Sequence, residues 1–340
     1  MRTLWQASRG VVLLVVVLIL SVLQASATGI SSPADNPTDA AILAEVSRLK
    51  SELTTLKLPA PEEESVAALL TRSERAAQAG HGFLSLHLLQ NAVPLMAGYK
   101  FRQSKGKADM PVLEREWHRL GPELTARQRK LVLTRRLPLA VQAVLERALI
   151  QVQPNYQASL QYGQEAGVES GLFYLGFAQG QLDFIEFCRT LKFTAPAVTP
   201  LPAPAPALAA LEAEVLAAYR KYDTSEQHSA FIRVNSLLKV AQDLAKEHRN
   251  SGVWLQVFEA RRAFAAILPD GAENLDATAL RQQSASVRAQ LTRAAGDQSL
   301  GWLYWQLAET ALTGDDLKSA NVILQRVLPA YFQVATRSKR

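Results

Sequence analysis

The chain has a single cysteine, Cys188, among its 340 residues, which excludes an intramolecular disulfide. Its apolar context predicts a buried thiol. Patterns that form β-strands are also scarce, because alternating β-branched residues are few. Ala, Leu, Gln, Arg and Glu instead recur at helical spacing, in segments that open on proline, serine or acidic residues and close on glycine. These features predict an all-α fold.

Catalytic motifs are absent from the sequence as well. No Gly-x-Ser-x-Gly, His-Glu-x-x-His or phosphate-binding glycine loop occurs. Ser-x-x-Lys appears twice, at Ser47 and Ser236, but both copies lie in predicted amphipathic helices and lack a Lys-Thr-Gly partner. His81 and His87 are six residues apart, so they do not share one helical face as metal ligands. The sequence therefore predicts a non-enzymatic protein without a cofactor or a metal.

One acidic residue has a catalytic alternative. Glu169, followed by Ser170, is similar to the Glu-Ser pair of lytic transglycosylases, in which the glutamate is the general acid that cleaves wall glycan. The Gly-Leu-Met-Gln segment of that family is missing here. An acidic residue in the first turn of a helix is also stabilised by the helix dipole. The structural explanation is favoured, and an envelope enzyme acting on wall glycan is the alternative hypothesis.

The first 27 residues have the pattern of a secretory signal peptide. Arg2 and Arg9 give a positive start, Val11–Leu20 is an unbroken apolar run, and the segment ending at Ala27 fits a cleavage site. The apolar run stops at Leu23, short of the roughly 18 to 20 residues that span a bilayer. We expect an exported protein, periplasmic or secreted, that is cut after Ala27 and has no nucleic-acid partner. An uncleaved membrane anchor is the alternative.

Positive charge is concentrated between Lys100 and Arg147, where twelve Lys and Arg residues stand against five Asp and Glu. One interpretation is a solvated helix face. The other is a surface that binds an anionic envelope component or an acidic protein. The candidate residues of this basic surface are Lys100, Arg102, Lys105, Lys107, Arg127, Arg129, Lys130, Arg135 and Arg136.

A heptad pattern follows the polar N-terminal stretch, with apolar residues at spacings of 4, 3, 4 and 3. Glu45 and Glu52 fall at g positions, and Lys50 and Lys57 fall at the e positions that pair with them between two parallel chains. Two interpretations stay open: a homodimer through this helix, or an amphipathic helix packed on its own domain. The candidate oligomerisation seam is Ile42, Val46, Leu49, Leu53 and Leu56.

The two halves of the body resemble each other. Thr194–Ala207 holds five prolines and predicts an extended linker. Across it, residues match in order at an offset of 130 to 131, which predicts an internal duplication. The matched pairs include Leu113 with Leu244, Glu116 with Glu247, His118-Arg119 with His248-Arg249, Gly121 with Gly252, Leu137-Pro138 with Leu268-Pro269, Ala148-Leu149 with Ala279-Leu280 and Leu160 with Leu291. We interpret Gly121 and Gly252 as caps that follow a helix whose last turn carries His and Arg.

Aromatic residues gather in a second matched stretch, where GLFYLGFA from Gly171 aligns with GWLYWQLA from Gly301. Rings around the whole circumference of a helix are typical of burial in a helical array. A ligand groove lined by the same rings is the alternative. The rings concerned are Phe173, Tyr174 and Phe177 in one copy, and Trp302, Tyr304 and Trp305 in the other.

The C-terminal unit GWLYWQLAETALTGDDLKSANVILQRVLP, Gly301 to Pro329, resembles a tetratricopeptide repeat, which is a two-helix hairpin. The residues that carry the resemblance are Tyr304, Leu307, Ala308, Gly314-Asp315, Ala320 and Leu324. It implies a helical-repeat scaffold that binds protein partners. The order of export signal, heptad helix, linker and helical repeats also looks like that of periplasmic coordinators of envelope machinery.

The expected architecture is two tandem helical-repeat modules preceded by a short heptad helix. The boundaries are a signal peptide over 1–27, a polar segment with the heptad helix and a proline hinge over 28–61, helical module 1 over 62–193, a Pro/Ala-rich linker over 194–207 and helical module 2 over 208–340. The favoured function is an exported, non-enzymatic adaptor for partner proteins or an anionic envelope component.

Overall fold

A computed structural model describes residues 37–131, 137–193, 201–222, 227–268 and 274–337. The regular structure of these residues is entirely helical, which confirms the all-α prediction. None of the described helices combines the length and the apolarity needed to cross a bilayer. The predicted signal peptide, Arg135, Arg136 and the first half of the predicted linker lie outside the described residues.

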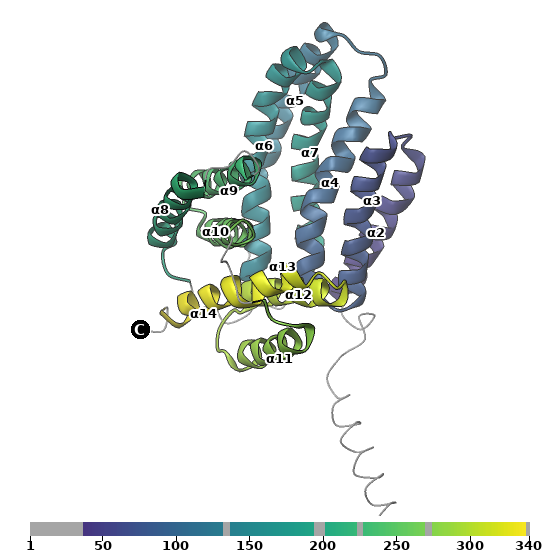
Figure 1. Ribbon diagram of the computed structural model, residues 1–340. Helices are drawn as coiled ribbons and strands as arrows, with labels where there is room; N and C mark the ends of the chain where they lie inside the picture. Colours follow the sequence, from purple (N-terminus) through teal and green to yellow (C-terminus); the bar gives the residue numbers. More distant parts are fainter. Residues whose placement is uncertain (1–36, 132–136, 194–200, 223–226, 269–273, 338–340) are drawn as a thin grey trace, which may run out of the picture.

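The first half of the chain forms a bundle of antiparallel helices (Figure 1). Its helices are α2 (Pro37–Thr55), α3 (Ala60–Gln78), α4 (Gly82–Ser104), α5 (Met110–Lys130), α6 (Leu139–Glu165) and α7 (Val168–Thr190). α7 lies between α4 and α6 and packs along both of them. Cys188, near the end of α7, is buried as predicted.

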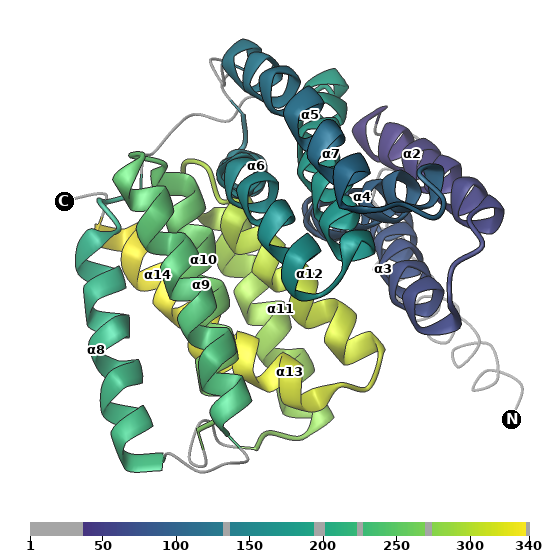
Figure 2. The ribbon, with the colours of Figure 1, turned by 90° about the horizontal axis from the view of Figure 1, so that it is seen from above.

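The second half continues the helical array beside the first (Figure 2). It consists of α8 (Ala205–Tyr222), α9 (His228–Lys246), α10 (Asn250–Ala265), α11 (Ala277–Arg293), α12 (Ser299–Thr313), α13 (Leu317–Val322), the π-helical turn η2 (Ile323–Val327) and α14 (Leu328–Arg337). α8 begins inside the predicted linker, because Pro204 and Pro206 stand at its start, where proline is tolerated. α10 packs on α6, and α12 crosses the ends of α4 and α6.

The halves share one connected core, and polar side chains of the second half cap helices of the first. The N-termini of α4 and α6 have no side-chain cap of their own. The Gln306 side chain accepts a hydrogen bond from the Leu84 N–H at 3.1 Å. Asp297 accepts one from the Leu139 N–H at 2.6 Å. These bonds satisfy amide groups that a helix N-terminus otherwise leaves unpaired.

The heptad seam is covered by the chain itself. Ile42 and Val46 are fully buried, Leu49 and Leu53 nearly so, and Leu56 is half-buried, because α2 packs on α3 and α4. The structure thus shows the second of the two interpretations, a helix on its own domain. Lys50 and Glu52, which were expected to form ion pairs between two chains, form them within a single chain. Lys50 pairs with Glu74 at 2.5 Å, and Glu52 pairs with Lys100 and Arg48.

The internal duplication is not confirmed, and part of its basis is wrong. His118 lies in the middle of α5, whereas His248 lies in the turn between α9 and α10 with φ at +56°. Gly121 caps nothing, because α5 continues to Lys130. A Cβ at Gly121 would come within 2.2 Å of the Tyr156 hydroxyl, so this glycine makes room for that ring. The His-Arg and Gly121 matches therefore do not reflect equivalent positions in the two halves.

Glycines determine how closely α4 and α7 approach. A Cβ at Gly176 would lie 2.6 Å from the Ala97 carbonyl oxygen and 3.0 Å from the Gly98 Cα. A Cβ at Gly180 would lie 2.7 Å from the Pro94 Cα. These neighbours are backbone atoms, which move less easily than the end of a side chain. The stretch Val168–Gly180 is thus a packing helix that depends on its glycines.

We expect Gly176→Ala to destabilise the protein by about 2 kcal/mol. The added methyl group would force α4 and α7 apart, and this destabilisation is larger than the stabilisation that the higher helix propensity of alanine provides. Urea unfolding followed by circular dichroism measures the change. Gly314→Ala is the control, since its Cβ would have no neighbour closer than 3.4 Å. Equal stability of the two variants would contradict the glycine-dependent approach.

Candidate functional site

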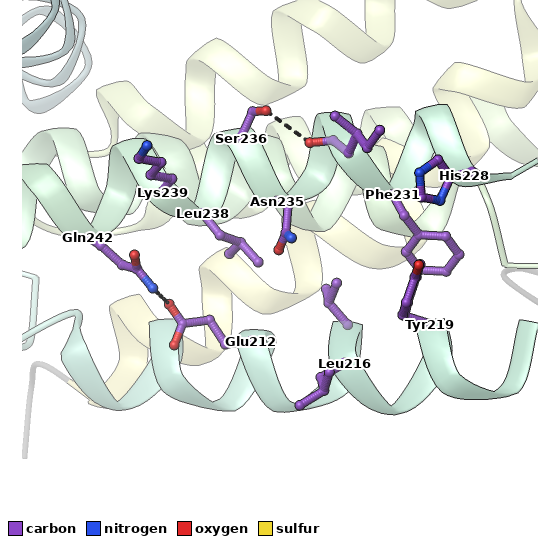
Figure 3. A pocket seen from close by; sticks show the side chains of 12 residues that line it. Glu212, Leu216, Tyr219, His228, Phe231, Asn235, Ser236, Leu238, Lys239 and Gln242 are labelled. Atoms are coloured by element: carbon purple, nitrogen blue, oxygen red, sulfur yellow. Dashed lines mark hydrogen bonds between the residues drawn. The ribbon is translucent and has the colours of Figure 1, made fainter. Parts of the chain in front are cut away.

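The best-defined candidate site is a groove between α8 and α9 with a volume of about 610 Å³ (Figure 3). Asn235 and Leu238 of α9 point from one side toward α8. Half of the twelve lining residues are apolar or aromatic, and the polar ones include Asn235, which points into the groove. The lining residues are Glu212, Val215, Leu216, Tyr219, His228, Phe231, Ile232, Asn235, Ser236, Leu238, Lys239 and Gln242.

The groove exists because the two helices use only part of their apolar surface in the core. α8 buries Leu208, Leu211 and Val215 and packs chiefly on α9 and α10. Leu216 is 51% exposed and Ile232 is 54% exposed. Among the described residues, only one other large hydrophobic side chain is exposed, Tyr162, with 37% of its surface accessible. Exposed apolar area is therefore concentrated at the α8–α9 groove.

The ends of the groove are closed by side-chain contacts. At one end the Gln242 amide donates a hydrogen bond to the Glu212 carboxylate at 2.8 Å. At the other end the Tyr219 and Phe231 rings pack edge to face, with centroids 5.3 Å apart. A groove between two helices with apolar side chains from both has the shape and chemistry that receive the apolar face of an amphipathic helix.

The basic residues predicted as one surface are not brought together. Arg102 pairs with Glu62 at 2.6 Å, and Lys105 pairs with Glu116 at 2.9 Å. Arg127 pairs with both Asp183 and Glu186. Lys100 pairs with Glu52, as already described.

The remaining described members of that set, Lys107, Arg129 and Lys130, are exposed but lie at opposite ends of α5. A 21-residue helix is about 30 Å long. Because they are so far apart, these three cations do not form one anion site.

Other candidates from the sequence occupy structural positions. Glu169 is exposed in the first turn of α7, where the helix-dipole explanation places it. The Ser236 hydroxyl donates to the Ile232 carbonyl oxygen at 2.9 Å, within its own helix. His81 packs edge to face on Trp305, with centroids 5.7 Å apart.

The aromatic residues divide between core and partial exposure. Tyr304 is fully buried and donates its hydroxyl to the Leu255 carbonyl oxygen at 3.1 Å. Trp305 is buried, and its ring N–H donates to Ser284 at 2.9 Å. These two confirm the core interpretation. Trp302, Phe173, Tyr174 and Phe177 are half-buried at the edges of that core, and none of them lines the α8–α9 groove.

A cluster of buried charges was missed by sequence reasoning. Glu259 of α10 accepts a hydrogen bond from Arg262 at 2.7 Å, and the His87 Nε2 of α4 lies 4.0 Å from its other carboxylate oxygen. Arg147 of α6 is a further charge of this cluster, and its Nε is buried without a hydrogen-bond partner among the described residues. The four residues come from three helices that are far apart in the sequence, so no local spacing of residues predicts the cluster.

The environment of the buried charge cluster shifts its pKa values. Burial opposes ionisation of Glu259, but its positive neighbours, chiefly Arg262, outweigh burial and lower the pKa of Glu259 to about 2. Burial lowers the pKa of His87 to about 4, although the Glu259 carboxylate partly opposes this. At neutral pH the cluster is therefore one carboxylate, two guanidiniums and a neutral imidazole.

Comparisons with family models, with curated proteins and with solved structures give no significant match to this chain. The geometry of its own residues therefore carries the functional argument.

Proposed function

We propose that the protein is an exported, non-enzymatic adaptor that binds an amphipathic helix of a partner protein in the α8–α9 groove. The observation that carries the proposal is the exposure of Leu216 and Ile232 on the two helices that line this groove. Large apolar side chains gathered at a surface hollow mark interaction sites in soluble proteins. The resemblance of Gly301–Pro329 to a tetratricopeptide repeat supports the same class of function.

The lining of the groove favours a helix over an anionic envelope component. Apolar side chains of both helices line it, so apolar residues at i, i+3, i+4 and i+7 of the partner would pack against them. Its charged lining residues have opposite signs, with Glu212 on α8 and Lys239 on α9. A partner helix with basic residues toward α8 and acidic residues toward α9 is complementary to both.

We expect the double variant Leu216→Glu/Ile232→Glu to lose partner binding by about thirtyfold or more, because each carboxylate would be buried against apolar surface. Both side chains are more than half exposed, so folding stability should change by no more than about 0.5 kcal/mol per substitution. Selection of helical peptides on the wild type, followed by affinity measurement on the variant, tests both expectations. The selected peptides should share the i, i+3, i+4, i+7 apolar pattern.

The matched control is Ala44→Glu/Ser47→Glu, which adds two negative charges to the exposed face of α2. This control should bind the selected peptides as the wild type does. A photo-crosslinker at position 232 of the full chain in its native envelope then identifies the natural partner segment. Crosslinks that survive Leu216→Glu, or a selection without an amphipathic consensus, would refute the groove as the binding site.

A further inference from the structure

A second pocket of about 280 Å³ lies on the other flank of α9, where α9, α10 and α13 meet. Three cations from three different helices line it: Arg233 of α9, Arg262 of α10 and Lys318 of α13. Among the described residues, no carboxylate lines this pocket. Its lining is Ala230, Arg233, Arg262, Ala263, Ala266, Ile267, Lys318, Ser319 and Val322.

The charges of this pocket are not balanced by the protein. Arg262 uses one terminal nitrogen for Glu259, and its Nε is buried without a hydrogen-bond partner among the described residues. Glu259 must also offset Arg147, so the buried charge cluster retains an excess positive charge. Arg233 and Lys318 are exposed and form no ion pair in the described part of the chain. Like charges that converge in this way cost free energy unless an anion joins them.

Asp316, two residues before Lys318, is a carboxylate that is already engaged. The Asp316 side chain accepts a hydrogen bond from the Ser319 N–H at 3.1 Å, where it caps α13. Asp316 is exposed and does not line the pocket. It therefore weakens the positive potential at the rim without filling the site.

The size of the pocket comes from its small residues. Three alanines, at positions 230, 263 and 266, leave room between α9 and α10. A compact oxyanion fits such a volume, with guanidinium forks and an ammonium as donors. Arginine presents paired N–H groups that match the oxygens of a phosphate.

We propose that the α9–α10–α13 pocket binds a phosphate group, either as free phosphate or as the phosphate of a monoester. Arg233 and Lys318 approach from the exposed side, and Arg262 contributes from the inner side. This site is separate from the α8–α9 groove and does not depend on the function proposed for it.

Calorimetric titration of the full chain with inorganic phosphate, at constant ionic strength set by sodium chloride, tests the proposal. We expect saturable binding to the wild type, and affinity at least about tenfold weaker for Arg233→Gln and for Lys318→Gln, because each removes a charge-assisted contact. Both residues are exposed, so the variants should fold. Lys246→Gln, at an exposed lysine in the last turn of α9, is the matched control and should bind phosphate as the wild type does.

A parallel titration with glycerol 3-phosphate distinguishes the two sources of the group. Tighter binding than inorganic phosphate assigns the site to a phosphate monoester, and weaker binding assigns it to the free ion. Acetate at the same ionic strength should not compete. Absence of saturable binding for both phosphates, or equal binding by the Arg233→Gln/Lys318→Gln double variant, would overturn the proposal.

Discussion

Replacement of Glu259 by glutamine should destabilise the protein by about 3 to 5 kcal/mol, the largest effect that we expect from a single substitution. Glu259 is the only carboxylate described in the buried charge cluster, where it offsets Arg147 and Arg262. Removal of its charge leaves two half-buried guanidiniums without compensation, and burial of an unpaired charge is costly. Urea unfolding of wild type and Glu259→Gln measures the difference.

Two further variants isolate the electrostatic origin of this loss. Arg147→Met in the Glu259→Gln background should recover part of the stability, because it removes one of the stranded charges. Glu214→Gln is the matched surface control, since Glu214 has a half-exposed side chain 3.7 Å from Arg261. It should cost no more than about 1 kcal/mol. If Glu259→Gln unfolds at the same urea concentration as the control, the cluster does not stabilise the fold as described.

Acidification should destabilise the fold between about pH 6.5 and pH 4 through His87. The folded pKa of about 4 lies below the unfolded value of 6.5, so the unfolded state binds more protons in this window. Stability therefore falls as the pH drops through it, by up to about 3 kcal/mol in total at about 1.4 kcal/mol per pH unit. Arg147, Arg262 and Arg72 face the imidazole with positive charge, and Glu259 opposes them.

The pH dependence is best measured as a difference between variants. His87→Gln removes this titration, so its free energy of unfolding should fall less steeply than that of the wild type between pH 6.5 and pH 5. Glu259 contributes in a lower window, from about pH 4.5 to pH 2, because its folded pKa is depressed. Parallel profiles for wild type and His87→Gln would contradict a buried, neutral His87.

Local patterns in the sequence were sufficient for the helices but not for their partners. The heptad spacing predicted a helix with Ile42 and Val46 on one face, and α2 has both buried. Which surface covers that face depends on α3 and α4, whose positions no heptad encodes. Proline at position 59 likewise predicted the break between α2 and α3. The periodicity of a sequence thus identifies the apolar face of a helix, but the packing of distant helices decides which surface covers that face.

The functional candidates were harder to predict because they combine distant residues. Leu216 and Ile232 look like ordinary core residues in amphipathic helices, but each follows the buried residue of its helix by one position, and the fold leaves both exposed. Arg233, Arg262 and Lys318 are separated by 29 and 56 residues, and they converge only in the fold. The basic run from Lys100 was conspicuous in composition, but acidic neighbours in space neutralise much of it.

The caps that join the two halves also determine when the protein can finish folding. The Leu84 and Leu139 N–H groups can be capped only after Gln306 and Asp297 have been synthesised, 222 and 158 residues later in the chain. A chain that emerges from its N-terminus therefore cannot place these two caps on α4 and α6 until nearly all of it has been made. The N-terminal ends of both helices reach their final hydrogen bonding only when the segment from Asp297 onward packs against the first half.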